Sequence, residues 1–110
     1  MKFFNDPAAE KELNDVVAFY EQQQIGLGDR FLNEFERVVT LLTEHPELGA
    51  RVGQDARFIV LNRFPFRLVY AVEESVVRII AVAHQKRRPD FWRGRVEDPR
   101  PRYTILRRAA

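Results

Sequence analysis

The spacing of the apolar residues changes near the middle of the chain. In the first half they recur every three or four positions, as on one face of a helix. Two such stripes occur, one of Ala9, Leu13, Val16, Val17 and Tyr20, and one of Phe31, Phe35, Val38 and Leu42. The second half instead carries short runs of β-branched and aromatic residues, which are typical of strands. The pattern predicts a helical half followed by a sheet, an α+β fold.

Local signals set the expected boundaries of the helical half. A short strand is predicted over residues 2–4, and Asp6-Pro7 then starts a helix, with the Asp6 carboxylate accepting from free N–H groups. We expect this helix to end near Gln24, because residues 25–28 contain two glycines and predict a turn. Asp29 is predicted to cap a second helix, which His45-Pro46 ends. The two helices should form an antiparallel pair.

Three strands are predicted after a loop over residues 47–56, at residues 57–61, 66–73 and 76–84. Glu74 and Ser75 form the expected turn, so that position 73 faces position 76. This register predicts one face that receives the helices: Leu68, Tyr70, Val72, Val77, Ile79, Ala81 and Ala83. It predicts an opposite face made of Arg67, Val69, Ala71, Arg78, Ile80, Val82 and His84.

The remaining residues favour one domain with a tail. A short helix is expected over residues 90–95, and no periodicity follows it. The length of 110 residues suits one compact domain. We therefore expect a single domain over residues 1–95 and a basic tail over 96–110. Because the sequence shows neither a signal-peptide pattern nor an apolar run of membrane-spanning length, we expect a cytoplasmic protein.

The net charge of +2 conceals a strong asymmetry. Residues 1–50 carry four Lys/Arg and ten Asp/Glu, whereas residues 84–110 carry nine Lys/Arg and three Asp/Glu. Such a separation predicts attraction between the C-terminal part and an anionic partner, either nucleic acid or an acidic protein segment. The alternative is a basic surface that contacts solvent and binds no partner.

Several chemistries lack the residues that they need. The chain has no cysteine, and its one serine, Ser75, lies in a predicted turn away from His45 and His84. A nucleophilic serine and a bound transition metal are therefore not expected, and no cofactor or metal is predicted. The Gly26-x-Gly28 pattern weakly resembles a phosphate cradle, but Asp29 beside it would repel an anion. A turn between helices is the better interpretation.

A basic and aromatic cluster is what remains as a candidate site. It comprises Arg67, Arg78, His84, Lys86, Arg87, Arg88 and Trp92. The Arg67 guanidinium could hold a phosphate or a carboxylate with two hydrogen bonds, and His84 could exchange protons near neutral pH. Trp92 and Phe91 offer stacking surfaces, although Phe91 is better explained as a core residue. Arg67 and Arg78 could instead pair with the acidic helices.

Three stretches together resemble a known superfamily. The order of one strand, two helices and three strands, with AAEKELNDVVAFYEQ, RFPFRLVYAVEE and IIAVAHQKRRPDFW, is similar to RelE/ParE toxins of type II toxin–antitoxin modules. The resemblance covers roughly residues 2–95. It extends to plasmid stabilisation proteins of the ParE type. It implies a small α+β domain held inactive by a cognate antitoxin protein. RelE-like members cut ribosome-bound messenger RNA without a metal, whereas ParE-like members bind DNA gyrase.

Departures from the RelE pattern favour the ParE-like alternative. Phe58 and Val60 stand where RelE-like nucleases carry two lysines, and Trp92 stands where they carry a stacking tyrosine. The positions matched by basic residues are Arg67, Lys86 and Arg88, with His84 as the remaining candidate base. We therefore expect a non-enzymatic gyrase inhibitor, neutralised by its antitoxin. The alternatives are a nuclease that uses Arg67, His84, Lys86 and Arg88, and a non-toxic binding module of the same fold.

Overall fold

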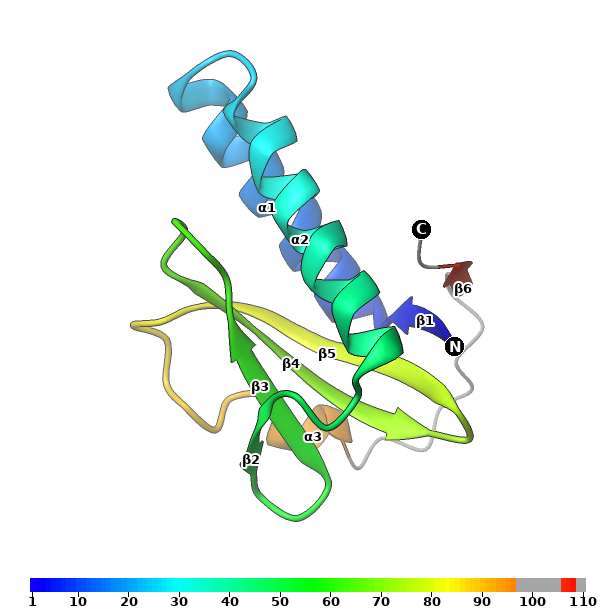
Figure 1. Cartoon of the computed structure of the whole chain (residues 1–110). Coiled ribbons are helices and arrows are strands. Elements are labelled where there is room, and N and C mark those ends of the chain that lie inside the picture. Colours follow the sequence, from blue (N-terminus) through cyan, green and yellow to red (C-terminus); the bar gives the residue numbers. More distant parts are fainter. Residues whose placement is uncertain (97–105, 109–110) are drawn as a thin grey trace.

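The fold places two long helices on one face of a sheet and one short helix on the other (Figure 1). A computed structural model describes residues 1–96 and 106–108 of the chain. Along these residues the elements are β1 (Lys2–Asn5), α1 (Pro7–Gln23), α2 (Leu27–Glu44), β2 (Ala50–Val52), β3 (Ala56–Val60), β4 (Phe66–Glu73), β5 (Val76–His84), α3 (Arg93–Val96) and β6 (Leu106–Arg108). The predicted α+β class and the pair of helices are confirmed.

The strands form one sheet in the order β2-β3-β4-β5-β1-β6. β1 lies parallel to β5, and the other neighbours are antiparallel. The predictions for β4 and β5 match their bounds. The prediction of a loop over residues 47–56 was wrong, because residues 50–52 form β2 and pair with β3 around a turn at Gly53. β6 lies within the predicted tail, whose residues 97–105 and 109–110 are outside the described residues.

Asp6 is the N-cap residue of α1 as predicted, but neither predicted capping bond forms. The carboxylate of Asp6 makes no capping bond, although Asp6 does precede α1. α2 begins at Leu27, two residues before Asp29. Its first turn is capped by Glu21, whose carboxylate accepts the N–H groups of Gly26 and Gly28 at 3.0–3.1 Å. A side chain from the preceding helix therefore supplies the acceptors, and it also occupies the donors that a phosphate would need.

The two helices approach closely at Gly28. A Cβ atom added to this glycine would lie 2.6 Å from the backbone oxygen of Val17, which is too short for any side chain. The absence of a side chain at position 28 therefore sets how near α1 and α2 can pack.

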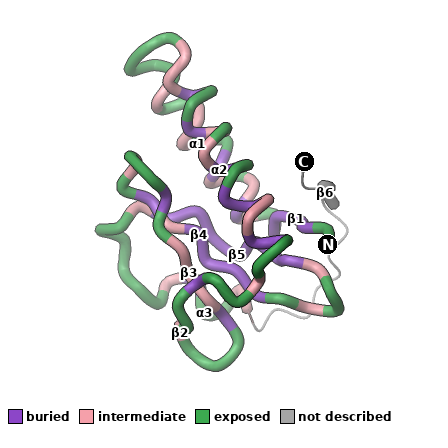
Figure 2. The backbone as a smooth tube through the Cα atoms, in the orientation of Figure 1, coloured by how far each residue is buried: buried purple, intermediate pink, exposed green. Residues whose placement is uncertain are grey.

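The main core lies between the helical pair and the sheet, where buried segments of both layers meet (Figure 2). Its fully buried members include Leu13, Phe31, Phe35, Leu42, Leu68, Tyr70, Val77 and Ile79. A smaller cluster lies on the other face and contains Ala56, Val69, Ala71, Ile80, Ala81 and Trp92. Apolar area buried on both faces stabilises the sheet by about 25 cal/mol per Å².

A β-bulge corrects the predicted faces of β5. The pairs nearest the turn, such as Val72 with Val77, have the predicted register, but the register shifts between Val69 and Tyr70. Ile80 is the extra residue, so every later side chain of β5 changes face. Val82 consequently joins the helix-side core and Ala81 the opposite cluster. Ala83, predicted to face the helices, pairs with Arg67 instead, and His84 pairs with Phe66 rather than lying on the face of Arg67.

Tyr70 links the sheet to the segment that enters β2. Its hydroxyl donates to the backbone oxygen of Pro46 at 2.7 Å and accepts the N–H of Gly49 at 2.8 Å. The ring is fully buried, and burial raises the pKa of Tyr70, although the Gly49 hydrogen bond opposes that change. The hydroxyl therefore satisfies two backbone groups of a segment that has little other regular structure.

We predict that Tyr70→Phe will lower the free energy of unfolding by about 1–3 kcal/mol, because the buried Gly49 N–H loses its acceptor. Urea unfolding of the purified chain measures this change. Tyr20→Phe is the control, since no hydrogen bond of the Tyr20 hydroxyl occurs among the described residues and its loss should cost less than about 0.5 kcal/mol. Equal effects of the two substitutions would contradict the proposed role of Tyr70.

Candidate binding surface

A cationic turn follows β5, and we call His84, Lys86, Arg87 and Arg88 the basic rim. The turn is held against the start of β4, because the N–H of Gln85 donates to the backbone oxygen of Pro65 at 2.8 Å. It closes with a second bond from the N–H of Arg87 to the oxygen of His84 at 2.9 Å. Main-chain hydrogen bonds thus position the rim, and the side chains of Lys86, Arg87 and Arg88 are left for other contacts.

His84 belongs to the rim through its ring nitrogen. The Nδ1 atom accepts the backbone N–H of Lys86 at 3.0 Å, so the unprotonated form of Nδ1 holds the turn. The half-buried ring packs edge-on against Phe66, with centroids 5.2 Å apart. His84 therefore acts in the structure as a turn residue on the helix side of the sheet.

The three remaining rim residues are exposed: Lys86, Arg87 and Arg88. Arg88 lies 3.1 Å from an oxygen of Asp90, and Arg87 lies 3.5 Å from an oxygen of Glu12 and over the ring of Phe91. The side chain of Lys86 makes no ion pair within residues 1–96. Exposed pairs of this kind contribute about 0–1 kcal/mol, so they are easily exchanged for another anion. The rim keeps its positive charge available to a partner.

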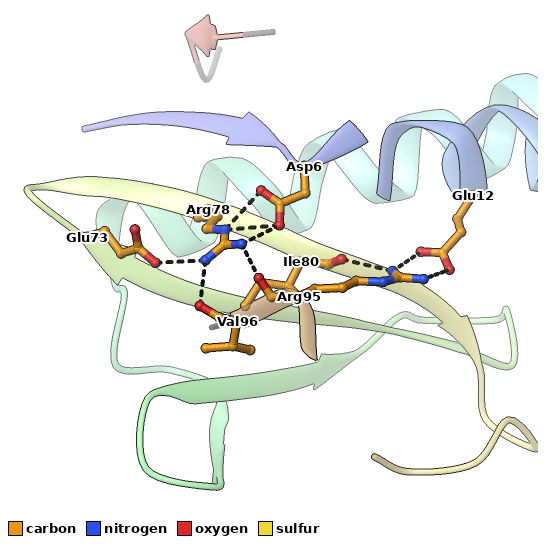
Figure 3. A network of polar contacts seen from close by, with 7 residues as sticks. All are labelled: Asp6, Glu12, Glu73, Arg78, Ile80, Arg95 and Val96. Atoms are coloured by element: carbon orange, nitrogen blue, oxygen red, sulfur yellow. Dashed lines mark hydrogen bonds and ion pairs between the residues drawn. The ribbon is translucent and has the colours of Figure 1, made fainter. Parts of the chain in front are cut away.

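Arg78 and Arg95, by contrast, are used inside the molecule (Figure 3). The Arg78 guanidinium donates to both carboxylate oxygens of Asp6 at 2.7–3.0 Å and to Glu73 at 3.0 Å. It also donates to the backbone oxygens of Val96, at 3.2 Å, and of Arg95. Only 3% of Arg78 is exposed. The sequence-predicted binding role of Arg78 therefore has no accessible guanidinium to support it.

The charges of Asp6 and Glu73 also govern the protonation of Arg78. Burial alone would lower the pKa of this guanidinium, but its hydrogen bonds and charge pairing with Asp6 and Glu73 outweigh burial and raise the pKa. Arg78 thus remains a buried cation that joins the start of α1, the end of β4 and the C-terminal end of α3.

Glu12 of α1 makes a second connection between the long helices, the sheet and α3, further along β5. Its carboxylate accepts two bonds from Arg95 at 2.9 Å and one from the N–H of Val82 at 3.1 Å. Arg95 in turn donates to the backbone oxygen of Ile80 at 3.1 Å (Figure 3). The edge of β5 that β1 does not cover is therefore closed by side chains. No sequence signal pointed to Glu12, because its partner lies far away along the chain.

Both aromatic candidates lie at the smaller core cluster, and they differ in how far they are buried. Trp92 is 3% exposed and belongs to the smaller core cluster, so its ring is not a stacking surface. Phe91 is half-buried, and the guanidinium groups of Arg87 and Arg95 lie 3.9 and 5.0 Å from its ring centroid. Phe91 packs against the smaller core cluster, as its interpretation as a core residue predicted, but its ring also contacts two guanidinium groups.

Arg67 lies on the sheet face away from α1 and α2, beside apolar neighbours. It pairs with Val60 across the strands, and its guanidinium lies 5.8 Å from the Phe58 ring. Its Nε and Nη2 atoms are buried and have no hydrogen-bond partner among the described residues. Because of the bulge, His84 lies on the other face of the sheet. The structure does not bring these two predicted residues together.

A second cationic surface was missed by the sequence reasoning. Arg30 and Arg37 are seven positions apart on α2, a spacing that places them on one helix face, and Arg63 lies near them in the turn after β3. The spacing was a readable signal for the first two, whereas the approach of Arg63 depends on tertiary packing.

The described residues offer no group of three or more metal-ligating side chains. Within the same part of the chain, no helix is both long and apolar enough to cross a bilayer.

The comparisons with known proteins point to one family. The profile described as the ParE toxin of type II toxin-antitoxin system, parDE, matches residues 5–89. The chain therefore belongs to the ParE toxin family. A solved structure described as the chromosomal ParDE TA system from P. aeruginosa is similar, with a TM-score of 0.56 at 18% identity, over 76% of this chain and 95% of that chain. That likeness concerns the fold. No curated protein sequence matches the chain significantly.

We predict that Arg78→Met will lower the free energy of unfolding by about 3–5 kcal/mol, because it leaves the buried Asp6 carboxylate without its cation. Urea unfolding measures the loss. Adding Asp6→Leu should recover a large part of it, since no unpaired charge then remains at that position. The control is Lys11→Met, which breaks an exposed pair with Asp15 and should cost less than about 1 kcal/mol. A loss below about 1 kcal/mol for Arg78→Met would contradict this account.

Arg67→Met should leave the free energy of unfolding unchanged or raise it by up to about 1 kcal/mol, because two unpaired buried nitrogens are removed. The matched control is Arg57→Met, which removes a half-buried sheet arginine that donates to the oxygens of Glu47 and Gly49. The control should lose about 1–3 kcal/mol in urea unfolding. If Arg67→Met destabilises the fold as much as the control does, Arg67 has a structural partner and no spare donors.

Proposed function

We propose that this chain is the toxin of a type II toxin–antitoxin module, that it stops bacterial growth by binding DNA gyrase, and that a cognate antitoxin neutralises it. Membership of the ParE toxin family supports the general role. The single observation that supports a surface for the target is the basic rim, whose cations stand exposed on a rigid turn while Arg78 and Arg95 are held inside.

The chemistry of the rim suits recognition of a large anionic partner. Lys86, Arg87 and Arg88 are consecutive and exposed, with only weak pairs to give up. A cluster of this kind raises the rate of encounter with acidic protein surfaces and with DNA, and its effect falls with ionic strength. DNA-bound gyrase offers at least one such surface, because DNA carries a continuous row of phosphate charges. The antitoxin is proposed to carry an acidic or amphipathic segment that competes for the toxin.

The arrangement of the candidate catalytic residues favours binding over RNA cleavage. Proton transfer requires a base within reach of the phosphate that an arginine stabilises. Here Arg67 and His84 lie on opposite faces of the sheet, and Nδ1 of His84 already accepts the N–H of Lys86. Phe58 and Val60 place apolar side chains on the face of Arg67. The proposal therefore needs no catalytic residue.

The proposal is tested by expressing the chain without an antitoxin and by two assays on the purified protein. We predict growth arrest, inhibition of gyrase supercoiling, and intact ribosome-bound messenger RNA. Lys86→Glu with Arg88→Glu should weaken the inhibition of supercoiling at least tenfold by reversing two rim charges. The matched control, Arg51→Glu with Arg93→Glu, changes the net charge equally at exposed positions outside the rim and should leave inhibition within threefold.

Cleavage of ribosome-bound message, lost in Arg67→Ala or His84→Ala, would overturn the proposal in favour of the nuclease. Normal growth with normal supercoiling would instead leave a non-toxic binding module. Equal weakening by the rim and control variants would show that net charge, and not the rim, carries the interaction.

A further inference from the structure

A hollow of about 540 Å³ lies between α2 and the turn that joins β3 to β4. We call it the arginine hollow. It is lined by Leu27, Arg30, Asn33, Glu34, Arg37, Asn62, Arg63 and Phe64. None of these residues belongs to the basic rim. Pro65, the last residue of the same turn, accepts the N–H of Gln85 and so holds the rim.

The hollow is rich in cations, whereas the first half of the sequence is rich in acidic residues. Residues 1–50 carry only four Lys/Arg, yet Arg30 and Arg37 from this segment both line the hollow, and Arg63 joins them. The same segment carries ten Asp/Glu. The hollow is therefore a local positive site within an acidic half of the chain.

Glu34 organises the wall of the hollow. Its two oxygens each accept one bond from Arg37 at 2.8 Å, and one of them also accepts the N–H of Asn62 at 2.7 Å. The hydrogen bond from Arg37, assisted by the Asn62 N–H and the charge of Arg63, holds the pKa of Glu34 below its usual value, against the effect of burial. The carboxylate thus neutralises Arg37 and fixes the turn at Asn62.

This arrangement leaves Arg30 and Arg63 without a direct ion pair, although the charge of Arg63 still acts on Glu34. Neither side chain makes an ion pair or hydrogen bond within the described residues, and both are exposed. Arg63 has a φ of 69°, a left-handed conformation that is unusual for a residue with a side chain. The local sequence therefore keeps an arginine where glycine would fit with less strain, which is typical of positions that contact a ligand.

The floor of the hollow is apolar and rigid. Phe64 is half-buried and packs edge-on against Phe31 and Tyr20, with ring centroids 5.0 and 5.1 Å away. Leu27 adds an aliphatic surface from the first turn of α2. Two unpaired guanidinium groups beside an aromatic floor suit a carboxylate next to an apolar side chain.

We infer that the arginine hollow binds an acidic peptide segment of a partner protein, with carboxylates on Arg30 and Arg63 and an apolar side chain on Phe64. A nucleic acid strand is disfavoured because its continuous row of phosphates would run along the acidic helical pair and past the Glu34 carboxylate. A short peptide places one or two carboxylates only where the cations are. The inference is independent of the growth-arrest proposal, since it concerns binding by the purified chain.

Fluorescence anisotropy tests the inference with a labelled 12-residue peptide of alternating glutamate and leucine. The hollow variant is Arg30→Gln with Arg63→Gly, in which glycine suits the left-handed backbone and should preserve the fold. We expect the Kd of the peptide to rise at least tenfold. The matched control, Arg51→Gln with Arg93→Gln, removes the same charge elsewhere and should leave the Kd within twofold. Urea unfolding checks the fold, and Arg30→Gln alone serves if the double variant is unstable.

The comparison ligands separate the outcomes. A peptide with glutamine in place of glutamate should bind at least tenfold more weakly than the glutamate peptide. Equal affinity of the hollow variant and the control would overturn the inference, and so would a loss of peptide binding only in Lys86→Gln with Arg88→Gln, which would place the peptide on the basic rim. A thymidine 20-mer whose binding depends on Arg30 and Arg63 more strongly than peptide binding does would reassign the hollow to nucleic acid.

Discussion

The buried ion pair between Arg78 and Asp6 is the interaction on which the rest of the structure depends. It joins residues 72 positions apart, and the same guanidinium holds Glu73 and the backbone oxygens at the end of α3. Removing a charge from water costs several kcal/mol, so such a group is stable only when its partners satisfy it completely. Here the pair fixes the start of α1 on one side of β5 and the segment after the basic rim on the other.

The division of the cations into two sets follows from this arrangement. Arg78 and Arg95 are surrounded by acidic and backbone acceptors, while the residues of the basic rim extend from a turn held by main-chain bonds. The net charge of the C-terminal part therefore overstates what a partner can reach. The cations that a partner can reach include those of the basic rim and those of the arginine hollow.

Much of the fold was predictable because local signals agreed with tertiary packing. The helical stripes ending in Tyr20 and Leu42 face the core, and β4 and β5 have their predicted bounds. The faces beyond Ile80 were not predictable, because one inserted residue inverts every later position and no local signal marked it. The burial of Arg78 and Trp92 was not predictable either, because the local sequence does not show whether a side chain contacts solvent or a distant segment of the chain. The family was predictable from the combination of stretches, and the profile match confirms it.

The central claim is that the target binds the basic rim, which precedes the segment held by the buried Arg78–Asp6 pair. Amide hydrogen exchange of the chain with and without DNA-bound gyrase tests it most directly. The account predicts that protection on binding is greatest at the amides of residues 85–88, because their hydrogen bonds lie in an exposed turn and exchange by local opening, which a bound partner would suppress. The β5 amides lie inside the sheet and should exchange slowly with or without the partner. Protection confined to the tip of the α1–α2 pair, with residues 85–88 exchanging as in the free chain, would contradict it.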